Sequence, residues 1–579
     1  MNNSKLRLVI SLLIAVGFSA CAPPSTNDSG NSTPSSSSTA SGDDTLKLLY
    51  WQAPTILNPH LATGFKDLDA ARIAYEPLAS YDKNDQLVPF LAAEIPSIEN
   101  GGVAPDGKSV IWKLKQNVQW SDGKPFTAED VVFTYEFAMN PQVAAASQEY
   151  FSTIETVEAV DPHTVKITFK TPTPGWSIPF TGQNGLILPR HIFEPYNGAN
   201  VREAPANQKP IGTGPYQVTE FKPGDIVIYE KNPTYWDQTP YFQRVELKGG
   251  GDAASAARAV LQTGDADYGY NLQVEANILQ QLEAGGQGKV VGNFGSEVER
   301  ILFNLTDPNR ETTEGERSSI EFPHPFFTDQ KVRQAIDLAI DRETIANQLY
   351  GKAGRPIAQL LVAPQVYKSD QISFGFDLEK AAKLLDEAGW KDTNGNNIRD
   401  KNGVEMTVVF QTSVNPVRQK TQEIIKQSLT QIGVQVELKS IDASVFFSGD
   451  PANPETLNRF YADLQEFATG NDNPDPGPYM KWWICDEIAQ KSNNWQKNNY
   501  ARYCNPDYDK LWQQANQEMN LEKRAELFRR MDELLRSEVI LIPIIHRAKA
   551  NGVSNRLVNV DPSPWDANTW DIKNWKRPD

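Results

Sequence analysis

One stretch of the chain carries acidic and amide side chains at a spacing that can bind a metal ion. Oxygen-bearing side chains stand at positions 1, 3, 5 and 9 of the EF-hand calcium loop pattern: Asp392, Asn394, Asn396 and Asp400. Position 6, however, is Asn397 rather than glycine, and position 12 is Gly403 rather than a bidentate glutamate. We therefore interpret the stretch as a polar turn between a helix and a strand, with calcium binding as the less favoured alternative.

Motifs for catalysis are not found elsewhere in the sequence. It contains no P-loop, no G-x-S-x-G, no H-E-x-x-H, no C-x-x-C and no G-x-G-x-x-G. The five histidines are scattered, with no pair at a metal-ligand spacing: His60, His163, His191, His324 and His546. A carboxylate pair that forms only on folding is not excluded by spacing. We predict a protein that is not an enzyme and needs no cofactor, and keep a secreted hydrolase or folding helper as a minor hypothesis.

The N-terminus indicates export. Lys5 and Arg7 precede an apolar run, Leu8–Phe18, which is shorter than the ~20 residues that span a bilayer. A basic segment followed by a short apolar segment is typical of a secretory signal, here residues 1–20. The small residue Ala20 and then Cys21 resemble a lipoprotein lipobox, although Phe18 stands where leucine is usual. We predict lipidation of Cys21; ordinary signal cleavage near Ala20 is the alternative.

Residues 21–44 follow as a predicted flexible linker. The segment is rich in Ser, Thr, Pro and Gly and has no aliphatic residue larger than alanine, so it cannot bury enough apolar surface to fold. A linker behind a lipid anchor suits a domain that is tethered to a membrane. Because an exported chain permits disulfides, we predict that Cys485 and Cys504 are joined; two free buried thiols are the alternative.

Composition sets the class of the remaining chain. The sequence has 579 residues, 39% of them apolar, and a net charge of −17. A length of this order corresponds to about three structural units. The negative charge argues against nucleic acid as a partner. Strands alternate with helices, which predicts an α/β fold: a helix over 416–432 lies between predicted strands 405–411 and 434–440, and one long helix is expected over 507–538.

Several segments resemble the family 5 extracellular solute-binding proteins of ABC importers, which include oligopeptide and dipeptide binders. The matching segments are residues 72–91, the run WKLKQNVQWSDGKPFTAEDVVF over 112–133, Gly212–Tyr216, Asn232–Trp236, Asp329–Ala335 and Tyr503–Asp509. The resemblance extends over about residues 46–560.

The resemblance implies a two-lobed periplasmic-binding-protein fold of type II, the large peptide-binder class, with an extra inserted subdomain. Ligand is expected between the lobes, which close by a hinge motion. The expected boundaries are lobe I over 45–75, 205–300 and 539–579, the inserted subdomain of lobe I over 76–204, and lobe II over 301–538.

The resemblance also implies ligand-binding residues. In peptide-binding members, an aspartate just before an Asp-Pro holds the ligand α-ammonium, and Asp472 falls at that position. Further expected ligand contacts are Gly470, Asn471, Thr63, Gly64, Phe65, Tyr150 and Arg547. Arg547 is interpreted either as a partner for a ligand carboxylate or as an exposed charge. Six residues before Asp472, where an oligopeptide binder has an arginine, this chain has Glu466, which puts the preferred peptide length in doubt.

The main hypothesis is a monomeric periplasmic or extracytoplasmic lipoprotein that passes peptides to an ABC permease and ATPase complex. An alternative keeps the receptor and changes the ligand to an oligosaccharide, a metal chelate or haem. The sugar ligand rests on four tryptophans that can stack on sugar rings: Trp482, Trp483, Trp495 and Trp512.

Overall fold

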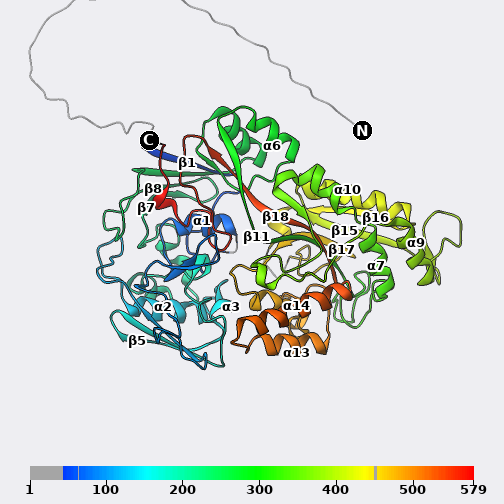
Figure 1. Cartoon of the computed structure of the whole chain (residues 1–579), viewed down its shortest axis with the longest axis horizontal. Helices are drawn as coiled ribbons and strands as arrows, with labels where there is room; N and C mark the ends of the chain where they lie inside the picture. Colours follow the sequence, from blue (N-terminus) through cyan, green and yellow to red (C-terminus); the bar gives the residue numbers. More distant parts are fainter. Residues whose placement is uncertain (1–43, 63, 449–452, 579) are drawn as a thin grey trace, which may run out of the picture. The chain divides into compact units, whose positions relative to one another are not determined.

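The computed structural model describes residues 44–62, 64–448 and 453–578 and is organised by one eleven-stranded sheet. In the order in which they lie side by side, its strands are β16 (Gln435–Ile441), β15 (Thr407–Ser413), β17 (Leu464–Thr469), β11 (Gly288–Phe303), β18 (Leu541–Ser554), β10 (Tyr268–Gly269), β1 (Thr45–Tyr50), β9 (Arg244–Gly249), β8 (Ile226–Lys231) and β7 (Tyr216–Lys222), with β12 (Gly354–Pro356) on β18. Figure 1 shows β11 and β18 in the middle, β1, β7 and β8 to one side, and β15, β16 and β17 to the other.

The long antiparallel pair β11–β18 connects the two sides of the sheet. One end of β18 pairs with β10, whereas β17 pairs with β11 only over Val298–Phe303. The ladder shifts register between Phe294 and Val298, so that the residues between them leave the regular pairing. A bulge of this kind bends a strand and re-aims its side chains.

Helices cover both faces of the β15–β17 side. Consecutive residues of β11 show this directly, because Ile301 packs into one buried cluster and Leu302 into another on the opposite face. The first cluster includes residues of α7 (Gln330–Leu338), α8 (Arg342–Ile345), α9 (Leu378–Glu387) and α10 (Pro416–Gln431). The second includes residues of α11 (Ala443–Phe446), α12 (Gly477–Met480), α13 (Pro506–Ala515) and α14 (Leu521–Ser537).

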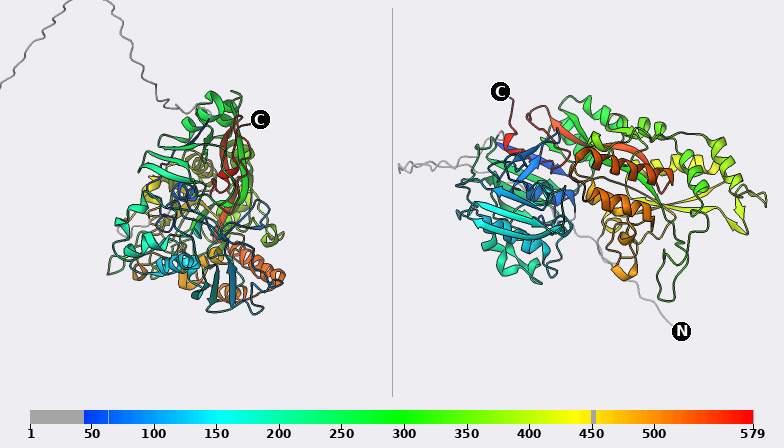
Figure 2. Two further views of the ribbon diagram at one scale, coloured as in Figure 1. Left: turned by 90° about the vertical axis from the view of Figure 1, so that its left-hand side faces the viewer. Right: turned by 60° about the horizontal axis from the view of Figure 1, so that its bottom comes forward.

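The part of the chain between β1 and β7 has a separate core, which extends from Leu61 to Ala206. It contains the sheet β4 (Ser109–Lys113), β6 (Thr164–Phe169) and β5 (Ile154–Asp161), the hairpin β2 (Ala79–Tyr81) and β3 (Leu87–Pro89), and the helices α2 (Ala128–Met139), α3 (Gln148–Phe151) and α4 (Arg190–Phe193). In both views of Figure 2 these light-blue to cyan elements stay together as a group. The helices α1 (Phe65–Arg72), α5 (Ala253–Arg258) and α6 (Ala276–Glu283) belong to the β1 side.

The predicted strands and the helix between them are confirmed, whereas the single long helix predicted near the C-terminal end is wrong. The strands β15 and β16 are parallel and enclose α10, close to the predicted bounds. The helix predicted over 507–538 is two helices, α13 and α14. The second helix begins after Asn520, because the Asn520 side chain accepts a hydrogen bond from the Lys523 N–H and so caps the N-terminus of α14. Among the described residues, no helix is long and apolar enough to cross a bilayer.

The Gly212–Tyr216 segment shows why a glycine is needed where two backbones meet. A Cβ on Gly212 would lie 1.8 Å from the Ala74 carbonyl oxygen, just after α1. The Gly214 N–H donates to the same oxygen at 2.8 Å. This contact joins the start of β7 to the chain that leads into the separate core.

We therefore expect Gly212→Ala to lower the free energy of unfolding by at least about 2 kcal/mol, since overpacking against a backbone oxygen cannot be relieved by a side-chain rotation. Urea unfolding followed by tryptophan fluorescence measures the change. Gly198→Ala is the matched control, because its Cβ would meet only the end of the Gln142 side chain, at 3.3 Å, and that of Asn200. Equal midpoints for the two variants would contradict this account.

Candidate functional site

Asp472 and Tyr150 meet although 322 residues separate them in the chain. The Tyr150 hydroxyl, on α3 of the separate core, donates to Asp472 Oδ2 at 2.7 Å. Burial raises the pKa of the Asp472 carboxyl; the hydrogen bond from Tyr150 opposes this shift and the nearby Glu297 adds to it. Because Tyr150 occupies Oδ2, Asp472 presents its second carboxylate oxygen to another donor.

The loop that carries Asp472 is fixed to the bulge of β11. A Cβ on Gly470 would lie 2.2 Å from the Ser296 carbonyl oxygen, so only glycine fits there. The Ser296 hydroxyl donates to the Asn471 carbonyl oxygen at 2.5 Å, and the Asn471 side-chain amide donates to Ala363 and Asn473 carbonyl oxygens. Gly470 and Asn471 therefore position Asp472. The contact with Ser296 has no signal in the sequence.

The end of β17 has an unpaired backbone edge. On one side β17 pairs with β11 as far as Thr469, but on the other side β15 pairs with it only as far as Glu466. No strand among the described residues continues that second edge along Phe467, Ala468 and Thr469. The edge stops just before Asp472, so an extended segment added there would place its end at the carboxylate.

On the β1 side, two of the three predicted residues are described. Gly64 is the N-cap of α1, and the exposed ring of Phe65 lies under the Lys549 ammonium, which is 5.0 Å from the ring centroid. Lys549 also opposes the raised pKa of Asp472, so the three side chains share one region. Thr63 lies outside the described residues.

Arg547 is not an exposed charge, which corrects one of the two sequence interpretations; its role as a partner for a ligand carboxylate stays a prediction. Its guanidinium donates to Glu299 Oε1 at 3.0 Å and lies 3.8 Å from a Glu297 oxygen. Arg418 of α10 binds both oxygens of Glu299, at 3.0 and 3.1 Å. Burial alone would raise the pKa of the Glu299 carboxyl, but Arg418 and Arg547 outweigh it and hold the pKa below its usual value. Sequence reasoning missed this cluster because its members are far apart in the chain.

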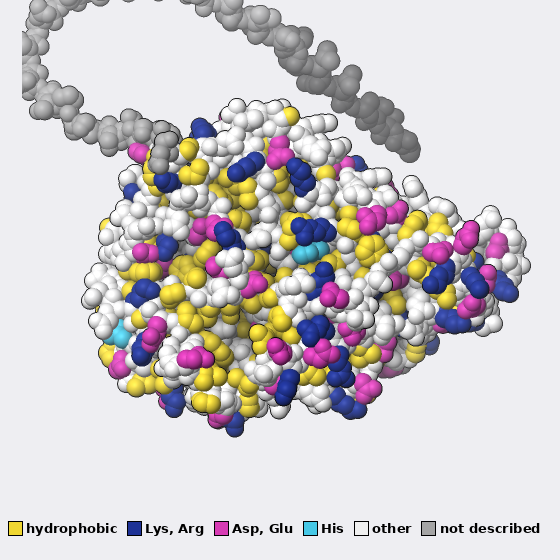
Figure 3. Space-filling view, viewed as in Figure 1, with side chains coloured by type: hydrophobic (Ala, Val, Ile, Leu, Met, Phe, Trp, Pro, Cys, Tyr) yellow, Lys and Arg dark blue, Asp and Glu magenta, His cyan; other side chains and the backbone are white. Residues whose placement is uncertain are grey.

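Two cavities lie near these groups. One, of about 180 Å³, is lined by residues of the separate core, including Tyr150, and by residues of the α12–α14 region, including Lys481. Across it the Lys481 ammonium pairs with Glu149 at 2.8 Å. The other, of about 30 Å³, is lined by Glu299 and Arg547 among others. Figure 3 shows hydrophobic, acidic and basic side chains together in the hollowed middle of this face.

The remaining sequence candidates lie elsewhere. Cys485 and Cys504 form a disulfide, with an S–S distance of 2.07 Å. In the loop proposed for calcium, Asp392 accepts from backbone N–H groups of the loop and Asp400 from Thr393, so these oxygens serve the turn before β13 (Asp400–Lys401) and β14 (Val404–Glu405). The described residues contain no cluster of three or more His, Cys, Asp or Glu placed for a metal ion. Cys21 lies outside them.

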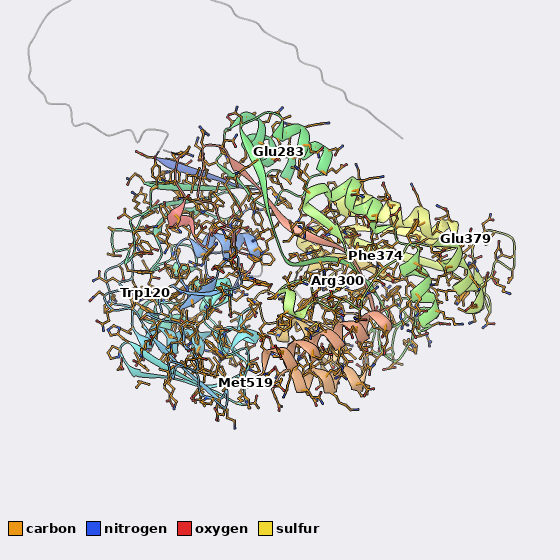
Figure 4. All side chains as sticks on the ribbon, viewed as in Figure 1. Trp120, Glu283, Arg300, Phe374, Glu379 and Met519 are labelled. Carbon is orange, nitrogen blue, oxygen red and sulfur yellow. A yellow bond between two sulfur atoms is a disulfide. The ribbon has the colours of Figure 1, made fainter. Side chains whose placement is uncertain are left out.

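Two of the tryptophans proposed for sugar stacking, Trp482 and Trp483, pack against Arg300 of β11. Arg300 is labelled in the middle of Figure 4. Its buried guanidinium lies 5.8 Å from the Trp482 ring centroid and 5.7 Å from that of Trp483. Phe467 and Tyr479 complete this aromatic surrounding. Trp483 and Trp495 are buried.

A comparison with protein families identifies the chain's relatives. The model of the bacterial extracellular solute-binding proteins, family 5, matches residues 86–490. The oligopeptide-binding protein AppA of Bacillus subtilis is 28% identical over 519 residues, which cover 88% of this chain and 87% of AppA.

Solved structures show the fold. The structure of Bacillus subtilis AppA in complex with a nonapeptide gives a TM-score of 0.75 at 24% identity, over 92% of this chain and 99% of that one. NikZ from Campylobacter jejuni in complex with Ni(L-His) gives 0.76 at 23% identity, over 92% of this chain and 100% of that one. The chain therefore has the mixed α/β fold of type II periplasmic binding proteins.

The Glu299–Arg418 pair makes a prediction for stability. Arg418→Met leaves the buried Glu299 carboxylate with Arg547 alone and should cost about 3 kcal/mol at pH 7. Because the pKa of Glu299 is depressed in the folded protein, the stability it contributes is present above about pH 4.3 and is lost as pH falls. The difference between variant and wild type should therefore shrink as pH falls from 7 to 3, with most of the change below about pH 4.3.

Chemical denaturation across this pH range is the measurement. Combining Arg418→Met with Glu299→Gln should recover part of the loss, because no buried charge is then left unpaired. Lys510→Met, which removes an exposed pair with Asp507, should change the free energy of unfolding by less than about 0.5 kcal/mol. A penalty for Arg418→Met that is constant with pH would refute the role assigned to Glu299.

Proposed function

Because this chain belongs to the bacterial extracellular solute-binding proteins of family 5, we propose that it is the receptor of an ABC importer that captures peptides outside the cytoplasm. It delivers them to the permease and ATPase complex and has no catalytic activity of its own. The peptide ligand is supported by the similarity to AppA, whose solved structure holds a nonapeptide.

The observation that carries the proposal is the Asp472 carboxylate at the end of the free edge of β17. A peptide backbone adds to Phe467–Thr469 as a further strand, a pairing that does not depend on peptide sequence. Its α-ammonium reaches the Asp472 oxygen that Tyr150 leaves available. A charge-assisted hydrogen bond in a site that excludes water is stronger than one in bulk water.

Binding is coupled to a hinge motion of two lobes, with the predicted boundaries at residues 75, 204, 300 and 538. Asp472 and Lys481 belong to lobe II, whereas Tyr150 and Glu149 belong to the inserted subdomain of lobe I. These two contacts form only when the lobes are closed. A ligand that touches both lobes binds the closed form better and shifts the population towards it. The permease recognises that form of the monomeric receptor.

The same receptor role for a non-peptide solute is the second candidate. A metal chelate is favoured by the fold similarity to NikZ, which was solved with Ni(L-His). An oligosaccharide or haem can be tested as a ligand in the titration described next.

Asp472→Asn is expected to weaken binding of a peptide with a free N-terminus by about 10- to 100-fold, the loss of a charge-assisted hydrogen bond, and to leave its N-acetylated form almost unchanged. Protein freed of carried-over ligand by unfolding and refolding is titrated calorimetrically with both peptides. Asp507→Asn, an exposed aspartate on α13, is the control and should match wild type. Equal losses of affinity for the two peptides would exclude the anchoring role of Asp472. If the same titration shows binding of Ni(L-His) or of sugars but of no peptide, the ligand is not a peptide.

A lipid on Cys21 is expected to hold the receptor at the membrane, with residues 22–44 as a tether. Cys21→Ser should move the protein from the membrane fraction to the soluble extracytoplasmic fraction and abolish metabolic labelling with a fatty acid. Because a single acyl chain gives only marginal membrane binding, labelling and fractionation are read together. Equal labelling of wild type and variant would contradict the prediction.

A further inference from the structure

Two buried glutamates lie on the same face of the sheet beside the ligand edge. In the antiparallel β11–β17 ladder, Glu299 faces Ala468 and Ile301 faces Glu466. Glu299 and Glu466 are therefore diagonal neighbours with side chains on one face. Ala468 belongs to the free edge proposed for the ligand, so Glu466 lies two residues before that position on the same face.

Glu466 has no cation of its own. It is fully buried, and neither carboxyl oxygen has a hydrogen-bond partner among the described residues. Arg418 uses its Nε and Nη2 atoms on Glu299, and its Nη1 donates to Ser413. Arg547 is shared between Glu299 and Glu297. The two arginines on this face are committed to other acids, and one carboxyl group is left over.

The buried Arg300 does not supply the missing partner. It neighbours Phe467, the next residue of β17, and so lies on the opposite face of the sheet from Glu466. Its guanidinium donates to the Tyr479 hydroxyl and is surrounded by aromatic rings. The backbone of the sheet separates it from the Glu466 carboxyl.

A small cavity with a mixed, largely apolar lining adjoins Glu299. It measures about 30 Å³, and its polar lining includes Gln273, Glu299, Tyr350, Asn415 and Arg547. Glu466 is not itself among the lining residues, but after burial both Glu299 and Glu466 raise the pKa of the Tyr350 hydroxyl, so Glu466 lies close to Tyr350 behind the lining. The head group of one side chain fits a space of this size, whereas a whole ligand does not.

We propose that Glu466 receives a cationic side chain of the bound peptide, so that the receptor selects ligands with a lysine or arginine at the position that faces this cavity. The inference rests on the proposed function, because it needs a peptide on the edge of β17. An ammonium or guanidinium group supplies the hydrogen bonds that Glu466 lacks and pairs with the carboxylate that forms when the acid loses its proton on binding.

Ligand binding then releases a proton. Burial and the neighbouring Glu299 raise the pKa of the Glu466 carboxyl well above its usual value, against the effect of Arg418, so the empty site holds a carboxylic acid. When the cation enters, the acid gives its proton to the buffer and the carboxylate pairs with the ammonium group. Among the described residues, Tyr350 also interacts electrostatically with Glu466, and Arg547 pairs with the neighbouring Glu299. No other bond is made or broken.

The test compares peptides that differ only in one charge. A pentapeptide with a free N-terminus is made with alanine throughout and then with either lysine or norleucine at each position in turn. Wild-type protein should bind one lysine peptide at least about tenfold more tightly than its norleucine match. Glu466→Gln should remove that preference and keep the affinity for the norleucine peptide. Asp571→Asn, a buried aspartate far along the chain, is the matched control and should keep the preference.

Calorimetry of the wild type in buffers of different ionisation enthalpy gives an independent readout that needs no variant. Binding of the preferred lysine peptide should release close to one proton per site more than binding of its norleucine match near neutral pH. If norleucine peptides bind and lysine gives no preference at any position, or Glu466→Gln retains it, the inference is overturned while the peptide receptor stands. If neither these series nor alanine peptides of two to nine residues bind, the proposed function fails.

Discussion

The antiparallel ladder between β11 and β18 is the constraint on which the rest of the molecule depends. These two strands run through both sides of the sheet, so each side is held in place by the same backbone hydrogen bonds. The break in register near Ser296 turns the loop before Asp472 into a fixed structure, because Ser296 contacts both Gly470 and Asn471. Next to the break, Glu299 of β11 and Arg547 of β18 form an ion pair. Thus one irregular ladder joins the two sides of the sheet and positions the loop that carries Asp472.

Buried charge near this ladder costs stability unless it is paired. Glu299 meets that cost with two arginines, and Asp472 meets part of it with the Tyr150 hydroxyl. Ion pairs of this kind are often no more stable than apolar residues of similar size. Their position at the ends of β15 and β17, where open α/β sheets bind ligands, gives a better reason for them than stability does. The polar groups are fixed before the ligand arrives, which reduces the entropy lost on binding.

How far the sequence predicts this structure depends on the range of the interaction. Local rules give α10 between two parallel strands, because Asn415 caps the helix and Pro416 suits its first turn. They fail at Asn520, where a cap interrupts an apolar pattern that continues through it. The resemblance to a family points to Asp472 and Tyr150, and the structure brings them together. It does not reveal the ion pair of Arg547 with Glu299, because the two residues are 248 positions apart and no spacing rule connects them. Ser296 and Arg418 escape sequence reasoning for the same reason.

The two parts of the candidate site impose different demands on a ligand. In the proposed binding mode, the edge of β17 pairs with backbone, which every peptide has, and Asp472 binds an N-terminus, which every unmodified peptide has. Neither selects one sequence over another. A receptor built only from these groups accepts any peptide of suitable length. Glu466 differs in kind, because a buried carboxyl without a partner penalises neutral side chains and favours cationic ones. The proposed preference for a cationic side chain therefore depends on a group that the fold leaves unsatisfied, because its hydrogen bonds remain to be made by the ligand.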